Sequence, residues 1–444
     1  MQDRSECGTD ATVSVGVTVT MSEASGSGRA GPEPRLEPPR LLGIFASWRL
    51  QAYGYTLAVF YAACLAYVYW LGAWLVNSSG VLLYHDFTNI WIAGTQALHG
   101  KAAAVYDQAA QMAAQEALVG AGQAVFSTWP YPPIYLLLLA PLGALSYVPA
   151  FMVWQLATLL GCVVVVYLIV QRREAIALVL ASPFTICNIL TGQSGFVTAM
   201  LLGASLLFLK HRPVLAGVFL GCLIYKPQFG ILLPLALVAA NEWRAFVSAG
   251  ITVLILTGAS ILAFGTEPWM AFPGELAAQA SGTVFGNASN QWGYFQTVYG
   301  LIRYLDHGPI LAWLAQGLAT SGTAVILWFV WRSSVRYPLK AATLSAAVLI
   351  ATPYAFGYDM AAIVIPFAFL ARDQIDRGML KGEQTIMLGL FVASFSVLPA
   401  AGRSPIGALI TLMLFYLILR RAFGASARPS IVQRFLGLFR ISDA

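Results

Sequence analysis

The chain has 444 residues, of which 59% are hydrophobic, 13% aromatic and only 10% charged. A soluble globular protein is about one quarter charged, and repeated apolar runs of roughly 15–24 residues predict an all-α polytopic membrane protein. The lack of two-residue alternation excludes a β-barrel. The net charge of +6 comes from basic residues in short loops, so it reports membrane orientation and does not indicate nucleic-acid binding.

The chain begins with a predicted disordered tail, residues 1–50, rich in Gly, Pro, Ser, Glu and Arg. The first membrane span is predicted from Tyr53 to Val76, and the membrane domain as a whole from 51 to 421. The next span is Val148 to Val170, and further spans are 175–191, 194–209, 213–226, 228–240, 245–264, 309–331, 338–353, 359–371, 384–402 and 404–420. This gives roughly twelve transmembrane helices.

A first loop at 77–147 contains an apolar stretch, 134–145, that is too short to cross a ~30 Å hydrocarbon core. We interpret this stretch as re-entrant, because all but four of the 25 lysines and arginines then fall on the side of the N-terminal tail. The positive-inside rule places both termini in the cytoplasm of a cell-membrane protein. The 77–147 loop and a second large loop, 265–308, are then extracytoplasmic, and 422–444 is a basic cytoplasmic tail.

Polar, aromatic and glycine-rich segments gather on the predicted outer face, so we expect any chemistry there. Asp86 begins the sequence DFTNIW and has two compatible interpretations, the N-cap of a helix from Phe87 to Leu98 or a functional carboxylate. His85 beside it is a surface residue or a site residue.

Four further residues carry polar groups at predicted span ends or in the second outer loop. Lys226 either extends its ammonium to the interface or contacts a lipid phosphate. Gln193, in a turn with Gly192, is a possible hydroxyl ligand, and Asp359 needs a partner or water at its membrane boundary. Arg303 lies in an amphipathic segment and is either solvated or a second phosphate contact.

Metal and redox sites are not expected. The five cysteines form no CxxC pattern and the four histidines are scattered, so we predict no cofactor and no metal ion. A metal site would form only if the carboxylates of Asp86 and Asp107 approached each other.

Several elements in order resemble glycosyltransferase family 87, which is typified by polyprenyl-phosphate-mannose-dependent α-mannosyltransferases. The first is DFTNIWIAGTQALHGKAAAVYD, in which the matching residues are Asp86, Phe87, Trp91, Ala93, Gly100, Tyr106 and Asp107. The others are YPPIYLLLLAPL at 131–142, the Gly192–Gln193 turn, an AG..LG……KP element ending at Lys226 and Pro227, and Thr352 to Asp359. Ile90 and the Thr352–Pro353 pair depart from the family pattern.

The resemblance implies a GT-C fold whose first outer loop, with short helices, carries the catalytic acid. It implies transfer of a hexose such as mannose from a polyprenyl-phosphate-sugar lipid to a glycolipid or glycan acceptor. Asp86 would then be the general base of an inverting displacement, and Lys226 with Arg303 would stabilise the leaving phosphate. The sugar and acceptor ligands would be His85, Phe87, Trp91, Tyr131, Gln193 and Asp359. The alternative is a polytopic transporter or lipid-linked sugar flippase, although no internal repeat is visible.

Overall fold

The computed structural model describes residues 47–123, 129–278, 292–398 and 404–424, and every regular element in those ranges is helical. The chain divides into residues 1–36 and 37–444, and all of the described elements belong to the second unit. Most of the two predicted tails, residues 279–291 of the second loop and the end of the predicted 384–402 span lie outside the described residues.

The α-helices of the first half are α1 (Ser47–Trp70), α2 (Asp86–Leu98), α3 (Gln108–Val119), α4 (Ile134–Leu139), α5 (Tyr147–Val170), α6 (Glu174–Ala181), α7 (Pro183–Thr191), α8 (Gly195–Phe208) and α9 (Pro213–Cys222). Those of the second half are α10 (Leu233–Ala239), α11 (Trp243–Phe264), α12 (Glu267–Ala278), α13 (Val298–Tyr304), α14 (Pro309–Arg332), α15 (Tyr337–Ala351), α16 (Val364–Arg377), α17 (Glu383–Ser394) and α18 (Ile406–Gly424). Short 3-10 turns include η2 (Ala102–Tyr106), η3 (Ala140–Ala144), η4 (Leu223–Tyr225), η5 (Pro227–Gly230) and η8 (Asp359–Ile363).

Five described helices are long and apolar enough to cross a membrane: α1, α5, α11, α14 and α18. A sixth span results if the bent pair α6 and α7 counts as one. The multi-pass membrane architecture is therefore confirmed. Each of the twelve predicted spans corresponds to helical structure, but several are shorter than a bilayer requires, so the number twelve stays a prediction.

The first predicted span was placed too far along the chain. Helix α1 begins at Ser47, inside the predicted tail, and ends at Trp70 instead of Val76. The apolar run continues, but Gly72 and Leu75 adopt positive φ angles and turn the backbone, and the side chains of Trp74 and Leu75 are buried in the core. Hydropathy alone does not detect a turn made by apolar residues.

The predicted 175–191 span is broken. Helices α6 and α7 meet at an angle of 54° on either side of Ser182 and Pro183. Proline lacks the N–H that would continue the ladder, and its ring crowds the preceding turn, so the helix restarts with Pro183 in its first turn. The break directs α7 toward the Gly192–Gln193 turn.

Helices α9 and α11 pack closely because α9 presents glycines four residues apart. A Cβ atom added to Gly217 would collide with the Ala245 carbonyl oxygen, and one added to Gly221 would lie 2.5 Å from Thr252 Cβ. Small residues at this spacing allow helix backbones to approach in membranes. The glycines in the AG..LG element therefore have a packing role.

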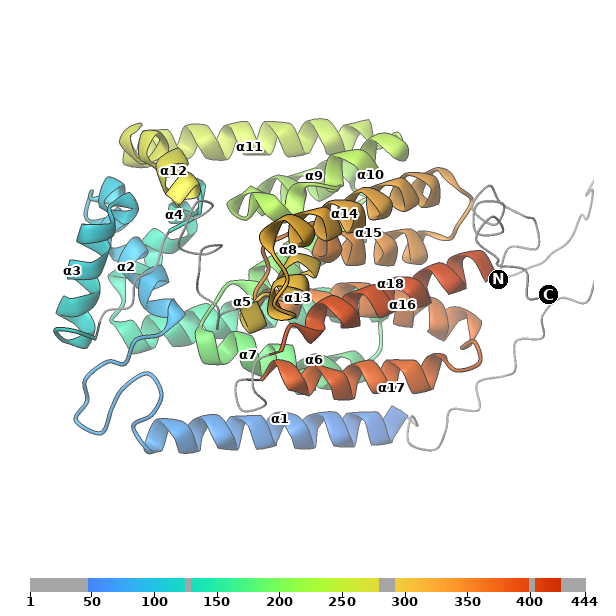
Figure 1. Cartoon of the computed structure of the whole chain (residues 1–444), viewed down its shortest axis with the longest axis horizontal. Helices are drawn as coiled ribbons and strands as arrows, with labels where there is room; N and C mark the ends of the chain where they lie inside the picture. The colour runs from blue at the N-terminus through green and yellow to red at the C-terminus, as the bar shows by residue number, and fades with distance from the viewer. Residues whose placement is uncertain (1–46, 124–128, 279–291, 399–403, 425–444) are drawn as a thin grey trace, which may run out of the picture. The chain divides into compact units, whose positions relative to one another are not determined.

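The elements of the first loop lie together at one end of the helices. Figure 1 shows α2, α3, α4 and α12 at the left, where α1 and α11 end. The α10–α11, α14–α15 and α16–α17 connections and the end of α18 lie at the other end. These are connections that the charge pattern predicts on one side of the membrane. The assignment of that side to the cytoplasm, and the re-entrant interpretation of α4 and η3, remain predictions.

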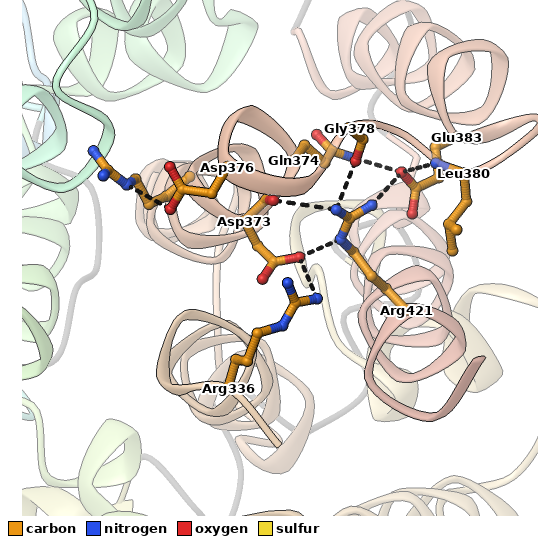
Figure 2. A network of polar contacts seen from close by, with 9 residues as sticks. Arg336, Asp373, Gln374, Asp376, Gly378, Leu380, Glu383 and Arg421 are labelled. Carbon is orange, nitrogen blue, oxygen red and sulfur yellow. Dashed lines mark hydrogen bonds and ion pairs between the residues drawn. The ribbon is translucent and has the colours of Figure 1, made fainter. Parts of the chain in front are cut away.

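A buried ion network fixes the end opposite α2 (Figure 2). The Arg421 guanidinium of α18 pairs with Asp373 of α16 and, at 2.9 Å, with Glu383 of α17. Its Nη2 also donates to the Gly378 carbonyl at 2.7 Å, and Arg336 before α15 reaches Asp373 at 3.1 Å. One arginine thus ties the last three long elements together, and nothing in the sequence pattern had indicated it.

Candidate active site

Asp86 is the first residue of α2, and the prediction that it caps the helix was wrong by one position. The N-cap is His85, which is extended and whose backbone N–H donates to Thr88 Oγ1 at 3.0 Å. The Asp86 carboxylate is consequently not used for capping. The residue as a whole is half-buried, and its carboxylate accepts a hydrogen bond from Gln193 Nε2 at 3.4 Å, across 107 positions of sequence.

The turn that brings Gln193 to Asp86 requires glycine. Gly192 has a φ of +73°, and a Cβ atom there would lie 2.5 Å from Phe87 Cβ. On the other side of the turn, a Cβ atom at Gly195 would collide with the Tyr358 carbonyl oxygen. The 192–195 turn therefore fits between the start of α2 and the segment that carries Asp359.

Buried side chains hold this turn in place. Trp154 Nε1 donates to the Gly192 carbonyl at 3.1 Å, and the Asn188 side-chain oxygen accepts from the Gly195 N–H at 2.8 Å. Both residues are nearly or fully inaccessible to solvent. Satisfied polar groups at such depth specify one arrangement, so the position of Gln193 is determined by the core.

Lys226 and Asp359 form a buried ion pair. Lys226 Nζ lies 2.5 Å from Asp359 Oδ1, and both side chains are 2% exposed. The rings of Tyr131, Tyr225 and Tyr358 surround the ammonium, with centroids 5.7, 5.9 and 5.1 Å from Nζ. Aromatic faces stabilise a cation that has left water, so Lys226 does not extend into the interface.

The second oxygen of Asp359 fixes the loop before it. Asp359 Oδ2 accepts from the Phe356 N–H at 3.0 Å, and the Asp359 N–H returns a bond to the Phe356 carbonyl at 3.0 Å. The Gln296 N–H donates to the Ala355 carbonyl at 2.8 Å. The ion pair therefore links the α9–α10 connection to both the 352–359 loop and the segment at 292–304.

The electrostatic environment of Asp86 suits a group that exchanges a proton near neutrality. Burial raises the pKa of Asp86 from 3.8 to about 6. The hydrogen bond from Gln193 and the charge of Lys226 act to lower this pKa, whereas the charge of Asp359 raises it further. Burial lowers the pKa of His85, which favours its neutral form. The charges of the Lys226–Asp359 pair thus influence the pKa of Asp86 directly.

The three aromatic residues predicted to bind the sugar differ in how exposed they are. Phe87 is fully buried between Tyr147 and Phe151, so in this conformation its ring offers no face to a ligand. Trp91 is partly exposed and its Nε1 donates to the Leu145 carbonyl at 2.9 Å. Tyr131 is nine-tenths buried against Lys226.

Arg303 belongs to a separate cluster. Its guanidinium stacks over Trp292 at 4.6 Å and donates to the His307 carbonyl at 3.0 Å. The described residues show no contact between Arg303 and Asp86 or Lys226. The connection is indirect, because the cluster around Trp292 packs against Tyr354 and Phe356 of the Asp359 loop.

The second acid of the first-loop motif does not approach Asp86 in this arrangement. Asp107 is exposed and caps α3, accepting from the Ala109 and Ala110 N–H groups at 2.9 and 3.1 Å. No cluster of three or more His, Cys, Asp or Glu residues suitable for a metal ion occurs within the described ranges.

Sequence reasoning found the charged residues but missed the aromatic cage. Tyr225 and Tyr358 each precede one member of the ion pair directly, and this shared Tyr-charge pattern was the available signal. Their convergence on Lys226 was not visible, because the two segments are 133 positions apart.

A comparison with protein families identifies the family but does not test the site. The sequence profile of glycosyltransferase family 87 matches residues 129–353, just over half of the chain. The match includes Gln193, Lys226 and Arg303, whereas Asp86 and Asp359 lie outside it. The chain matches no curated protein and no solved structure.

Proposed function

Because the chain belongs to glycosyltransferase family 87, we propose that it transfers a hexose, mannose in the first instance, from a polyprenyl-phosphate-sugar donor to a lipid or glycan acceptor on the extracytoplasmic face. Asp86 is the general base and the reaction inverts the anomeric carbon. The observation that carries the proposal is the Asp86 carboxylate, hydrogen-bonded to Gln193 and with a pKa of about 6 under the influence of the Lys226–Asp359 pair.

The chemistry is a single displacement. An acceptor hydroxyl gives its proton to Asp86 as its oxygen attacks the anomeric carbon. The bond between that carbon and the phosphate oxygen breaks, and the polyprenyl phosphate leaves with the electron pair. A base with a pKa near 6 is mostly ionised at neutral pH and still accepts a proton readily in the transition state.

Gln193 orients the base. Its Nε2 donates to one Asp86 oxygen, which leaves the other oxygen to the acceptor hydroxyl, and its Oε1 is buried without a hydrogen-bond partner among the described residues. A sugar or acceptor hydroxyl would satisfy that atom. Trp91 and Tyr131 are the aromatic residues that we propose to contact the sugar, and neutral His85 precedes the base directly.

Lys226 is the cation that stabilises the departing phosphate. The Lys226 ammonium has three N–H donors, and one of them is bonded to Asp359. The other two become available to a phosphate that displaces part of the tyrosine cage. Asp359 keeps the ammonium in position before the donor arrives. Arg303 would reach the phosphate only through movement of its own cluster.

The test is transfer of radiolabelled mannose from polyprenyl-phosphate mannose by the purified full-length protein in lipid nanodiscs. Asp86→Asn keeps the shape and the acceptor for Gln193 but removes the base, so we expect a loss of at least about a hundredfold. Asp107→Asn is the matched control, since it changes an exposed capping aspartate of the same loop. Equal transfer by wild type and Asp86→Asn would exclude Asp86 as the base.

A further inference from the structure

A shallow groove of about 550 Å³ lies at the N-terminal ends of α9 and α11. It is lined by Arg212, Pro213, Val214, Leu215, Val218 and Arg244. The α10–α11 connection beside it is at the end of the molecule opposite α2 (Figure 1), so the groove is separate from the candidate active site.

The two rims of the groove are held at a fixed separation. The close packing at Gly217 and Gly221 fixes α9 against α11, and Ser248 Oγ donates to the Val214 carbonyl at 2.7 Å. The floor between the rims consists of proline, valine and leucine side chains. A preformed apolar surface of this kind accepts a hydrocarbon chain without reorganisation.

Positive charge at the groove is not neutralised by the protein. Arg212 and Arg244 are exposed, and neither has an ion pair or side-chain hydrogen bond in the described part of the chain. Glu242, two residues before Arg244 in the sequence, is paired with Lys210 at 2.8 Å. The free N–H groups of the first turns of α9 and α11, which carry no side-chain cap, add partial positive charge.

The groove lies at the start of a candidate membrane span. Trp243 is exposed and begins the candidate membrane span that continues to Phe264, and Val247, Ile251 and Leu254 are exposed further along α11. Tryptophan is enriched at membrane interfaces, and the aliphatic side chains after it would face lipid tails. A ligand with a phosphate at the arginines and a hydrocarbon chain over Val214 and Val218 matches this order.

We propose that this groove is a binding site for one anionic phospholipid. Its phosphate lies between Arg212 and Arg244, and the upper part of one acyl chain covers the apolar floor. Charge complementarity selects an anionic headgroup, since a zwitterionic lipid would bring a second cation to the two guanidinium groups. The site is independent of the transfer reaction.

Native mass spectrometry of the full-length protein with added phosphatidylglycerol or phosphatidylcholine tests the proposal. We expect the wild type to retain one phosphatidylglycerol that phosphatidylcholine does not replace. In the double variant Arg212→Gln with Arg244→Gln, affinity for that lipid should fall about 10- to 30-fold. The matched control is Arg172→Gln with Arg173→Gln, which removes two other exposed arginines.

A second variant separates the groove from general charge effects. Val218→Trp fills the floor while both arginines remain, so it should also release the lipid, and its melting temperature reports whether the protein is folded. Equal phosphatidylglycerol retention by wild type, the arginine double variant and Val218→Trp would overturn the proposal. Equal loss in the Arg172/Arg173 control would do the same, because binding would then be a property of overall charge.

Discussion

Lys226 Nζ and Asp359 Oδ1 are 2.5 Å apart, both almost fully buried, although 133 positions separate them in sequence. Removing one member of such a pair leaves an uncompensated buried charge. Lys226→Met alone should therefore destabilise the protein by about 3–5 kcal/mol. The double variant Lys226→Met with Asp359→Leu should recover most of that stability, measured as the melting temperature in detergent, but not transfer. Recovery of transfer together with stability would reduce the pair to a structural role.

The activity should depend on pH through Asp86. Its pKa is about 6, and only the ionised form accepts a proton. Transfer should thus rise with pH to a plateau above about pH 7 and fall about tenfold for each unit below 6. A pH–rate profile in nanodiscs checks this, and a flat profile between pH 5 and 7 would contradict it.

The same raised pKa makes Asp86 unfavourable for folding at neutral pH. In the unfolded chain the group ionises near 3.8 and in the folded protein near 6, so the folded state binds more protons between these values. Its contribution to stability is lost as pH rises through that window. Asp86→Asn should melt at a higher temperature than wild type at pH 7.5 and at the same temperature near pH 3.5. A lower melting temperature at pH 7.5 would show that the ionised carboxylate stabilises the site.

Gln193 should set the pH at which the transfer rate falls on the acid side of the pH–rate profile, which we call the acid limb. Its hydrogen bond lowers the Asp86 pKa, so Gln193→Leu removes that effect and moves the limb to higher pH. Gln193→Glu is unsuitable as a control because it adds a charge, whereas Gln193→Asn shortens the same amide and should shift the profile in the same direction. An unchanged profile with reduced maximal rate would instead assign Gln193 to substrate binding alone.

The α9–α11 contact should not tolerate a methyl group. Gly217→Ala would drive a Cβ atom into the Ala245 carbonyl and should destabilise the protein by about 1–3 kcal/mol. Gly258→Ala is the control on α11, because no atom lies within 4 Å of its added Cβ. A melting temperature as high in Gly217→Ala as in Gly258→Ala would mean that the two helices can separate without penalty.

Composition and hydropathy were sufficient for the fold class. Long apolar runs with few charges predicted membrane helices, because a chain in lipid must satisfy its backbone internally. The ordered motifs predicted the family, which the comparison confirms. The break at Pro183 was not predicted, because hydropathy alone indicated one continuous span over 175–191.

The tertiary structure decided what the motif residues do. Asp86 was interpreted as the N-cap of α2 or as a functional carboxylate; the N-cap is His85, and the carboxylate accepts a hydrogen bond from Gln193. Lys226 was expected either to extend to the interface or to contact a phosphate; the structure rules out the first, since the ammonium lies in a tyrosine cage against Asp359, and the phosphate contact stays a prediction. These contacts join segments more than a hundred positions apart, and a single sequence contains local propensities but no record of which distant segments meet. The burial that raises the pKa of Asp86 arises only when those segments pack together.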